Sequence, residues 1–248
     1  MSGVLEVRGL ARSFGGVEAV RGIDFVVDAG ELVAMIGPNG AGKTTCFNMV
    51  NGQLAADAGS VRLNGRDLAH MKTLEIARLG VGRTFQVAAA FASMTVRENV
   101  QTALLAHRRR LANAWGRAAD LYRGEAERLL GRVGMAGQAD QACSSLAYGD
   151  IKRVELAVAL AGEPRLLLMD EPTAGMAARE REELMALVAG LAREQRIAVL
   201  FTEHDMDTVF AHADRILVLH RGRLIAQGRP DEVRANPEVR EVYLGQAA

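Results

Sequence analysis

Short runs of strand-forming residues recur along the chain, and stretches with helical patterning separate them. Three of the runs, residues 32–36, 166–169 and 198–201, are continuously apolar, as is typical of parallel strands whose two faces are both covered. Residues 180–193 have a helical pattern between two of these runs. The other runs are residues 4–7, 25–27 and 216–219. Strands that alternate with helices predict an α/β fold with a mostly parallel sheet.

Two regions depart from this alternation. Residues 60–65 end in Asn-Gly, a turn sequence that favours an antiparallel hairpin arm, so we expect an antiparallel β subdomain. From about 87 to 160 no strong strand signal is present, and alanine, leucine and arginine dominate. We therefore expect one domain over residues 1–248, in which 1–86 and 161–248 form the α/β core and about 87–160 form an inserted helical subdomain.

Composition narrows the functional classes. The 248 residues carry a formal net charge of zero, which argues against nucleic acid as a partner. The basic run at 107–110 is a candidate patch, with a solvated helix face as the alternative. The two cysteines form no CxxC pair, so a reducing compartment fits. No run of 18 apolar residues and no signal-peptide layout is present, so we expect a soluble chain that reaches a membrane only through a partner.

A phosphate-binding loop follows the apolar run at 32–36. Residues 37–44 match GxxxxGK[ST] between an expected strand and an expected helix. In this motif the backbone N–H groups face phosphate oxygens, Lys43 reaches the β and γ phosphates, and the Thr44 hydroxyl holds Mg²⁺. The expected nucleotide contacts are Gly37, Asn39, Gly40, Ala41, Gly42, Lys43, Thr44 and Thr45. The alternative is a glycine turn that caps a helix, and the preceding strand argues against it.

Polar residues end two other expected strands. Asp170 and Glu171 follow the run at 166–169, at the edge of the sheet where ligands bind in open α/β folds. There Asp170 would hold Mg²⁺, and Glu171 would polarise the attacking water. His204 follows the run at 198–201 and would hydrogen-bond the γ phosphate. The alternatives are an acid pair that caps the turn before Pro172 and a histidine that is only a polar strand end.

The order of these pieces resembles the ATP-binding subunits of ABC transporters over essentially the whole chain. The resemblance rests on the phosphate loop, Gln86, the Leu-Ala-Tyr-Gly run at 146–149, Asp170-Glu171 and His204. It implies the P-loop fold of that family and a head-to-tail dimer in which ATP lies between one subunit's phosphate loop and the other's signature segment.

Five further site residues are assigned by this resemblance. Phe14 would stack on adenine, and Gln86 would contact Mg²⁺ and signal to a membrane subunit. Ala147, Tyr148 and Gly149, in the signature segment 146–150, would grip the partner's γ phosphate at a helix N-terminus. The apolar residues 88–91 are a candidate surface for that membrane subunit, with a place in the chain's own core as the alternative.

A narrower resemblance points to the branched-chain amino-acid branch of ABC importers. It rests on residues 82–86, 146–149, 202–206 and 243–245, although lipopolysaccharide-export ATPases share some of these traits. It implies a second ATPase subunit, integral membrane permease subunits, a solute-binding protein acting indirectly, and a place on the cytoplasmic face of the cell membrane. The solute is a branched-chain amino acid or a related small molecule.

Two positions depart from the family pattern on the face offered to the partner subunit. Asp150 replaces glutamine or glutamate after the signature glycine, where it could cap a helix, and Ala177 replaces asparagine or aspartate. Our hypothesis is that the nucleotide site completed by this chain's signature hydrolyses ATP more slowly; a benign family variant is the alternative.

Three other classes of P-loop protein are disfavoured. A repair or ribosome-acting ABC ATPase usually has coiled-coil insertions or two cassettes, and the intact Glu171 and His204 argue against a nucleotide switch with little turnover. A small-molecule kinase would leave the signature segment unexplained.

Overall fold

The computed structural model of the chain describes residues 3–84, 90–108 and 121–244. Its larger sheet has six strands in the order β10-β9-β3-β8-β7-β6, parallel except for the antiparallel pair β9 and β10. The strands are β3 (Leu32–Ile36), β6 (Val81–Thr84), β7 (Leu166–Asp170), β8 (Ala198–Thr202), β9 (Arg215–His220) and β10 (Arg223–Gly228). The predicted α/β fold with a mostly parallel sheet is confirmed.

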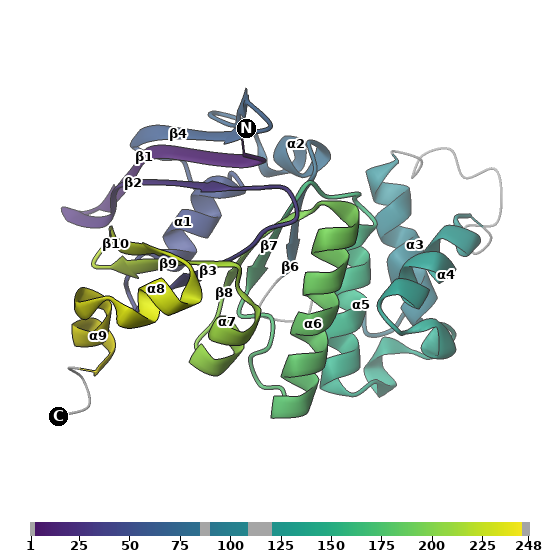
Figure 1. Ribbon diagram of the computed structural model, residues 1–248. Coiled ribbons are helices and arrows are strands. Elements are labelled where there is room, and N and C mark those ends of the chain that lie inside the picture. Colours follow the sequence, from purple (N-terminus) through teal and green to yellow (C-terminus); the bar gives the residue numbers. More distant parts are fainter. Residues whose placement is uncertain (1–2, 85–89, 109–120, 245–248) are drawn as a thin grey trace.

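A smaller antiparallel sheet of order β2-β1-β4-β5 packs above the larger one (Figure 1). Its strands are β1 (Leu5–Phe14), β2 (Val17–Val27), β4 (Ala58–Leu63) and β5 (Arg66–Asp67). Asn64 and Gly65 join β4 to β5, and both have positive φ, 49° and 78°. Asparagine and glycine are the residues that tolerate this conformation in tight hairpin turns, which explains why the Asn-Gly pair predicted the hairpin.

Helices cover both faces of the larger sheet. In Figure 1, α1 lies between the two sheets, α5 and α6 pack on the opposite face, and α3 and α4 lie at the far side of α5. The helices are α1 (Lys43–Val50), α2 (Thr73–Arg78), α3 (Val96–His107), α4 (Arg123–Arg132), α5 (Tyr148–Leu160), α6 (Ala178–Gln195), α7 (Met206–His212), α8 (Pro230–Ala235) and α9 (Pro237–Leu244).

The central strands divide their side chains between two hydrophobic cores. Val33 and Met35 of β3 pack with α1 and the smaller sheet, whereas Leu32, Ala34 and Ile36 pack with the helices of the other face. Alternate residues of a strand point to opposite faces, so a strand buried on both faces must be apolar throughout. This is why β3, β7 and β8 appear in the sequence as continuous apolar runs.

The segment from residue 90 to residue 160 contains α3, α4 and α5, and its described part has no β-strand. Its one contact of strand type is an isolated bridge between Thr95 and Ala142. The helical content agrees with the sequence pattern, while the division of the chain into a core and a subdomain remains a prediction. None of the helices in the described ranges is both long and apolar enough to span a bilayer.

Candidate functional site

The phosphate loop connects β3 to α1 through tightly packed glycines. Gly42 precedes the helix with φ 108°, and a Cβ atom there would lie 2.4 Å from the carbonyl oxygen of Ala19 in β2. A Cβ on Gly37 would lie 2.2 Å from the carbonyl oxygen of Leu219 in β9. Neither position has room for a side chain, so the loop's close packing between β2 and β9 requires glycine at both places.

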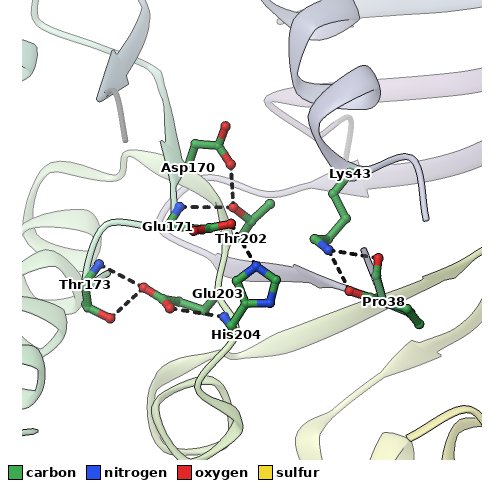
Figure 2. Close-up of polar contacts among 9 residues, drawn as sticks. Pro38, Lys43, Asp170, Glu171, Thr173, Thr202, Glu203 and His204 are labelled. Atoms are coloured by element: carbon green, nitrogen blue, oxygen red, sulfur yellow. Dashed lines mark hydrogen bonds and ion pairs between the residues drawn. The ribbon is translucent and has the colours of Figure 1, made fainter. Parts of the chain in front are cut away.

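Lys43 is the first residue of α1 and is 9% exposed. Its Nζ donates to the carbonyl oxygens of Gly37 at 2.6 Å and Pro38 at 3.2 Å, so the side chain folds back over the loop (Figure 2). Burial lowers the pKa of Lys43, and the carboxylates of Glu171 and Asp170 partly offset that shift. A cationic donor therefore stands over the loop and within the field of two acids.

Asp170 ends β7 and is held from two sides. Its Oδ1 accepts a hydrogen bond of 2.7 Å from the Thr202 hydroxyl at the end of β8. Its Oδ2 lies 3.5 Å from Nη2 of Arg83, and both side chains are largely buried. The same guanidinium donates to Asn48 in α1 at 2.9 Å and to Gln53 at 3.0 Å. Arg83 thus connects the Asp170 carboxylate to the helix that begins at the phosphate loop.

Glu171 lies against His204. Nε2 of His204 is 2.8 Å from Oε1 of Glu171, and because an ionised carboxylate only accepts hydrogen bonds, Nε2 must carry the hydrogen. The Glu171 side chain is 21% exposed, and the residue has a φ of 48°, unusual for a non-glycine residue. Its backbone N–H donates to both the carbonyl and the hydroxyl oxygens of Thr202, at 3.2 and 3.1 Å. Thr202 of β8 therefore holds the backbone of Glu171, and His204, just after β8, holds its carboxyl group.

The residue between Thr202 and His204 makes a third contact of the same kind. Glu203 accepts hydrogen bonds at Oε1 from the Thr173 backbone N–H at 2.9 Å and from the Thr173 hydroxyl at 2.6 Å. Figure 2 shows these bonds beside the Glu171–His204 pair. The end of β8 therefore holds the segment that ends β7 and follows it. Thr202, Glu203 and His204 together contact Asp170, Glu171 and Thr173.

The signature segment 146–150 leads into α5, which begins at Tyr148 with Ala147 as its N-cap residue. Asp150 lies inside the first turn, and no side chain caps this helix, so the expectation that Asp150 caps it is wrong. The acid instead lies where it favours the positive end of the helix dipole. Tyr148 is 42% exposed, and Gly149 is buried.

The remaining predicted residues occupy different surroundings. Phe14, at the end of β1, is 46% exposed, and the guanidinium carbon of Arg12 lies 5.1 Å from its ring centroid. Asn39, Gly40 and Thr44 are exposed along the loop. The predicted residues with smaller exposure are Ala41, which is buried, and Thr45, which is half-buried. Gln86 lies outside the described residues.

The candidate membrane-facing stretch at 88–91 is described only in part. Residues 88 and 89 lie outside the described ranges, Ala90 packs against the core, and Phe91 is 58% exposed. Phe91 therefore fits the docking hypothesis, whereas Ala90 fits the alternative of a place in the core.

Oxygen donors near the loop suit a magnesium ion. In the described ranges no three His, Cys, Asp or Glu side chains are grouped as a metal site. However, Mg²⁺ at a phosphate site is commonly held by one or two protein oxygens together with phosphates and water. Thr44 offers an exposed hydroxyl and Asp170 a carboxylate that its neighbours orient, which is the donor set that this ion prefers.

Sequence reasoning assigned no site role to Arg83, Thr202, Glu203 or Thr173. The signal for Thr202 and Glu203 was available, because both lie at the end of an apolar strand beside the strand that ends in Asp170. Arg83 gives a weaker signal, since only the fold brings β6 next to β7 and aligns the side chain with Asp170.

Comparisons with known proteins find similar sequences over nearly the whole chain. The family model described as "ABC transporter" matches residues 20–174, and a model described as "Branched-chain amino acid ATP-binding cassette transporter" matches residues 223–248. The high-affinity branched-chain amino acid transport ATP-binding protein BraF of Pseudomonas aeruginosa is 40% identical over 256 residues, covering 98% of each chain. The corresponding protein LivG of Escherichia coli (strain K12) is 38% identical over 254 residues, covering 98% of each chain.

Solved structures share the fold over nearly the whole chain. The ADP conformation of MJ1267, an ATP-binding cassette of an ABC transporter, superimposes with a TM-score of 0.87 at 29% identity, over 99% of this chain and 100% of that one. A nucleotide-free ATP-binding cassette from an ABC transporter gives a TM-score of 0.85 at 28% identity, over 97% and 98%.

Proposed function

Because this chain belongs to the ABC transporter family, as an ATP-binding and ATP-hydrolysing cassette, we propose that it powers uptake of branched-chain amino acids or a related small solute through separate membrane subunits. The names of its relatives and the match at residues 223–248 support this solute class. A second ATPase subunit, permease subunits and a solute-binding protein complete the proposed system, which would place the chain on the cytoplasmic face of the membrane.

The observation that carries the proposed chemistry is the pairing of Glu171 with His204 beside the phosphate loop. We propose that Glu171 accepts a proton from the attacking water while it directs that water in line with the γ phosphate. Contacts from β8 fix the backbone of Glu171, and His204 fixes the direction of its carboxylate. The contacts from β8 therefore keep the backbone of the base in place when ATP binds, although its side chain changes partner.

The substrate changes two contacts in this mechanism. Lys43 exchanges the carbonyl oxygens of Gly37 and Pro38 for the β and γ phosphates of ATP. His204 turns its N–H from Glu171 to the γ phosphate, which frees the carboxylate oxygen for water. Thr44 and Asp170 would hold Mg²⁺, which supplies positive charge to the phosphates. Phe14 would stack on adenine, and Gln86 would connect the metal to the membrane partner.

The signature segment is the part of this chain that would contact the partner's ATP in the dimer. We propose that Ala147, Tyr148 and Gly149 close over the ATP of a partner cassette, where the N-terminus of α5 and its backbone N–H groups attract phosphate charge. Gly149 is buried against the next helix, because a Cβ there would lie 3.3 Å from Glu180 of α6. Hydrolysis then reopens the dimer and returns the membrane subunits to their starting state.

The test compares wild type with Glu171→Gln, using ATP hydrolysis and light scattering of the full-length chain. The glutamine keeps the shape of the side chain but accepts a proton poorly, so turnover should fall by about 100-fold or more while ATP traps a dimer. Glu182→Gln is the matched control, since Glu182 also pairs with a histidine, His212 at 2.9 Å, but on the surface of α6.

The proposal fails if Glu171→Gln hydrolyses ATP as fast as the control. For the solute, the cassette reconstituted with its membrane subunits in vesicles should drive uptake of labelled leucine only when ATP is on the cassette's side. Leucine uptake without ATP, or ATP-driven uptake of another solute class alone, would overturn the transport assignment.

A further inference from the structure

Glu203 is a buried acid whose two oxygens serve two different segments. It is 5% exposed and lies between Thr202, the last residue of β8, and His204. Oε1 accepts both hydrogen bonds from Thr173, and Oε2 accepts one of 3.2 Å from the backbone N–H of His204. Burial of a carboxylate is unfavourable unless such bonds replace water. The carboxylate is therefore fixed in position by the residues on either side of it.

We propose that Glu203 is a positioning residue that sets the segment 173–177 and His204 in one fixed relation. Thr202 holds Asp170 and the backbone of Glu171, and His204 holds the Glu171 side chain. Glu203 extends this set of contacts to Thr173, where the chain turns away from β7 toward α6. A shift of His204 is thereby transmitted to the segment that follows Glu171.

The same segment contacts the start of α5. The Met176 backbone N–H donates to the Thr173 carbonyl at 3.1 Å, and the Met176 side chain is buried. A Cβ on Gly149 would lie 3.5 Å from Cε of Met176, and a Cβ on Gly175 would lie 3.6 Å from Cε1 of Tyr148. Segment 173–177 therefore lies beside the signature segment, with room for about a methyl group between each glycine and the side chain that faces it.

Glu203 thus lies between the Glu171–His204 pair and the signature segment of the same chain. On one side is the Glu171–His204 pair, and on the other is the signature face, connected through Thr173 and Met176. This inference rests on the proposed function, because the signature face matters only if it completes a partner's nucleotide site. In this proposal Glu203 contacts neither ATP nor the partner subunit. It nevertheless fixes the geometry of both the Glu171–His204 pair and the signature segment.

The chemistry of the carboxylate explains why this residue type is needed. A carboxylate accepts hydrogen bonds at both oxygens, so it can satisfy Thr173 and the His204 N–H together. An amide at the same place has one accepting oxygen and one donating nitrogen. In Glu203→Gln one of the two segments must therefore lose its partner and face another donor, although the side chain keeps its volume.

The experiment measures kcat for ATP hydrolysis, the Kd for ATP and the Tm of full-length Glu203→Gln, Thr173→Val and Thr173→Ser. Misplacement of the catalytic groups should lower kcat about tenfold in Glu203→Gln and Thr173→Val, with Kd changed by less than about twofold. Thr173→Ser retains the hydroxyl and should keep kcat within about twofold of wild type. The double variant Glu203→Gln with Thr173→Val should be no slower than Glu203→Gln alone, because both substitutions break the same connection between His204 and segment 173–177.

Two outcomes overturn the inference. One is a kcat for Glu203→Gln that equals that of the Glu182→Gln control. The other is a parallel loss of kcat, ATP affinity and Tm, which would show that Glu203 acts only in stability. Failure of the proposed function is recognised separately, because it appears as ATP hydrolysis that does not depend on Glu171. If Glu171→Gln is inactive and Glu203→Gln is fully active, the inference alone fails.

Discussion

Cys46 lies on α1, the helix that follows the phosphate loop, and its burial makes the stability of the fold depend on pH. Its thiol is fully buried on α1, in the core between the two sheets, and burial raises its pKa to about 12. In the unfolded chain a cysteine thiol has a pKa of about 8.5. The folded state therefore holds the proton more tightly than the unfolded state between these two values.

The sign of the pH dependence follows from this difference. The stabilising contribution of the protonated thiol is fully present below about pH 8.5 and is lost as the pH rises toward about 12. Between pH 8 and pH 10 wild type should lose about 2 kcal/mol more stability than Cys46→Ala, which has no such thiol. Urea unfolding at both pH values measures this difference; equal losses in the two proteins would contradict the assignment.

A second residue-scale feature is the charge arrangement around Asp170. Arg83 and the Thr202 hydroxyl occupy different oxygens of its carboxylate, so the acid is oriented before any ion arrives. Such preorganisation reduces the rearrangement needed on binding. Arg83, although positively charged, thus helps to orient the carboxylate that would bind the Mg²⁺ ion.

At the scale of one element, α6 begins without the usual N-cap side chain. Ala177 is its N-cap residue, with φ −66° and ψ 153°, and alanine offers no oxygen to the first N–H groups. Glu180 accepts from the Ala177 backbone N–H at 3.2 Å, which is half of a reciprocal capping arrangement. An asparagine at this position could supply the other half.

Ala177→Asn should therefore stabilise the isolated chain by about 1 kcal/mol, measured as a higher urea midpoint with an unchanged slope. Ala178→Asn, one residue inside the helix, is the matched control and should give no gain. In the assembled complex, Ala177→Asn combined with Asp150→Gln should also raise ATP turnover if the departures slow one site. Unchanged turnover would contradict that hypothesis and leave the stability effect standing.

At the scale of the whole molecule, the phosphate loop lies where the two hydrophobic cores meet. The alternating residues of β3 belong to both cores, and the loop continues directly from this strand. A ligand bound there favours the entire folded chain over the unfolded one.

ATP at about 100 times its Kd should therefore stabilise Glu171→Gln by about 2.7 kcal/mol. For a chain of this size that corresponds to a rise in Tm of about 5–10 °C. Lys43→Ala should keep its fold and lose most of this rise, because it lacks the group that reaches the phosphates. Thermal unfolding with and without Mg·ATP makes the comparison; an equal rise in Lys43→Ala would contradict the role assigned to that lysine.

A feature of the fold or the site could be predicted from the sequence when residues close together in the chain cause it. β3, β7 and β8 were predictable because burial of both faces leaves a mark in the sequence, and the Asn-Gly turn marked the β4–β5 hairpin. The edge strands β6 and β10 were missed, since β6 is only Val-Gly-Arg-Thr and β10 has one neighbouring strand. The contacts of Arg83 and Glu203 depend on strand order, which the residues themselves do not state. The assigned roles of the site residues remain predictions.

The packing around Gly42 has a consequence for how the protein is made. The Ala19 carbonyl oxygen faces Gly42 and also Gly222, where a Cβ would lie only 2.9 Å away. Gly222 in turn donates its backbone N–H to the Ala41 carbonyl at 3.0 Å and accepts from Arg21 at 2.8 Å. The strand that leads into the loop also pairs with β8 and β9, which come much later in the chain.

Synthesis on the ribosome runs from the N-terminus, so residues 37–44 follow β2 but emerge long before β9 and Gly222, which also shape the loop. The growing chain then carries a complete phosphate-loop sequence but lacks the side of the loop formed by β9 and Gly222 until residue 222 has been added. Such a chain should be unable to bind nucleotide for most of its synthesis. A polypeptide released early would then neither consume ATP nor compete with finished cassettes for a partner.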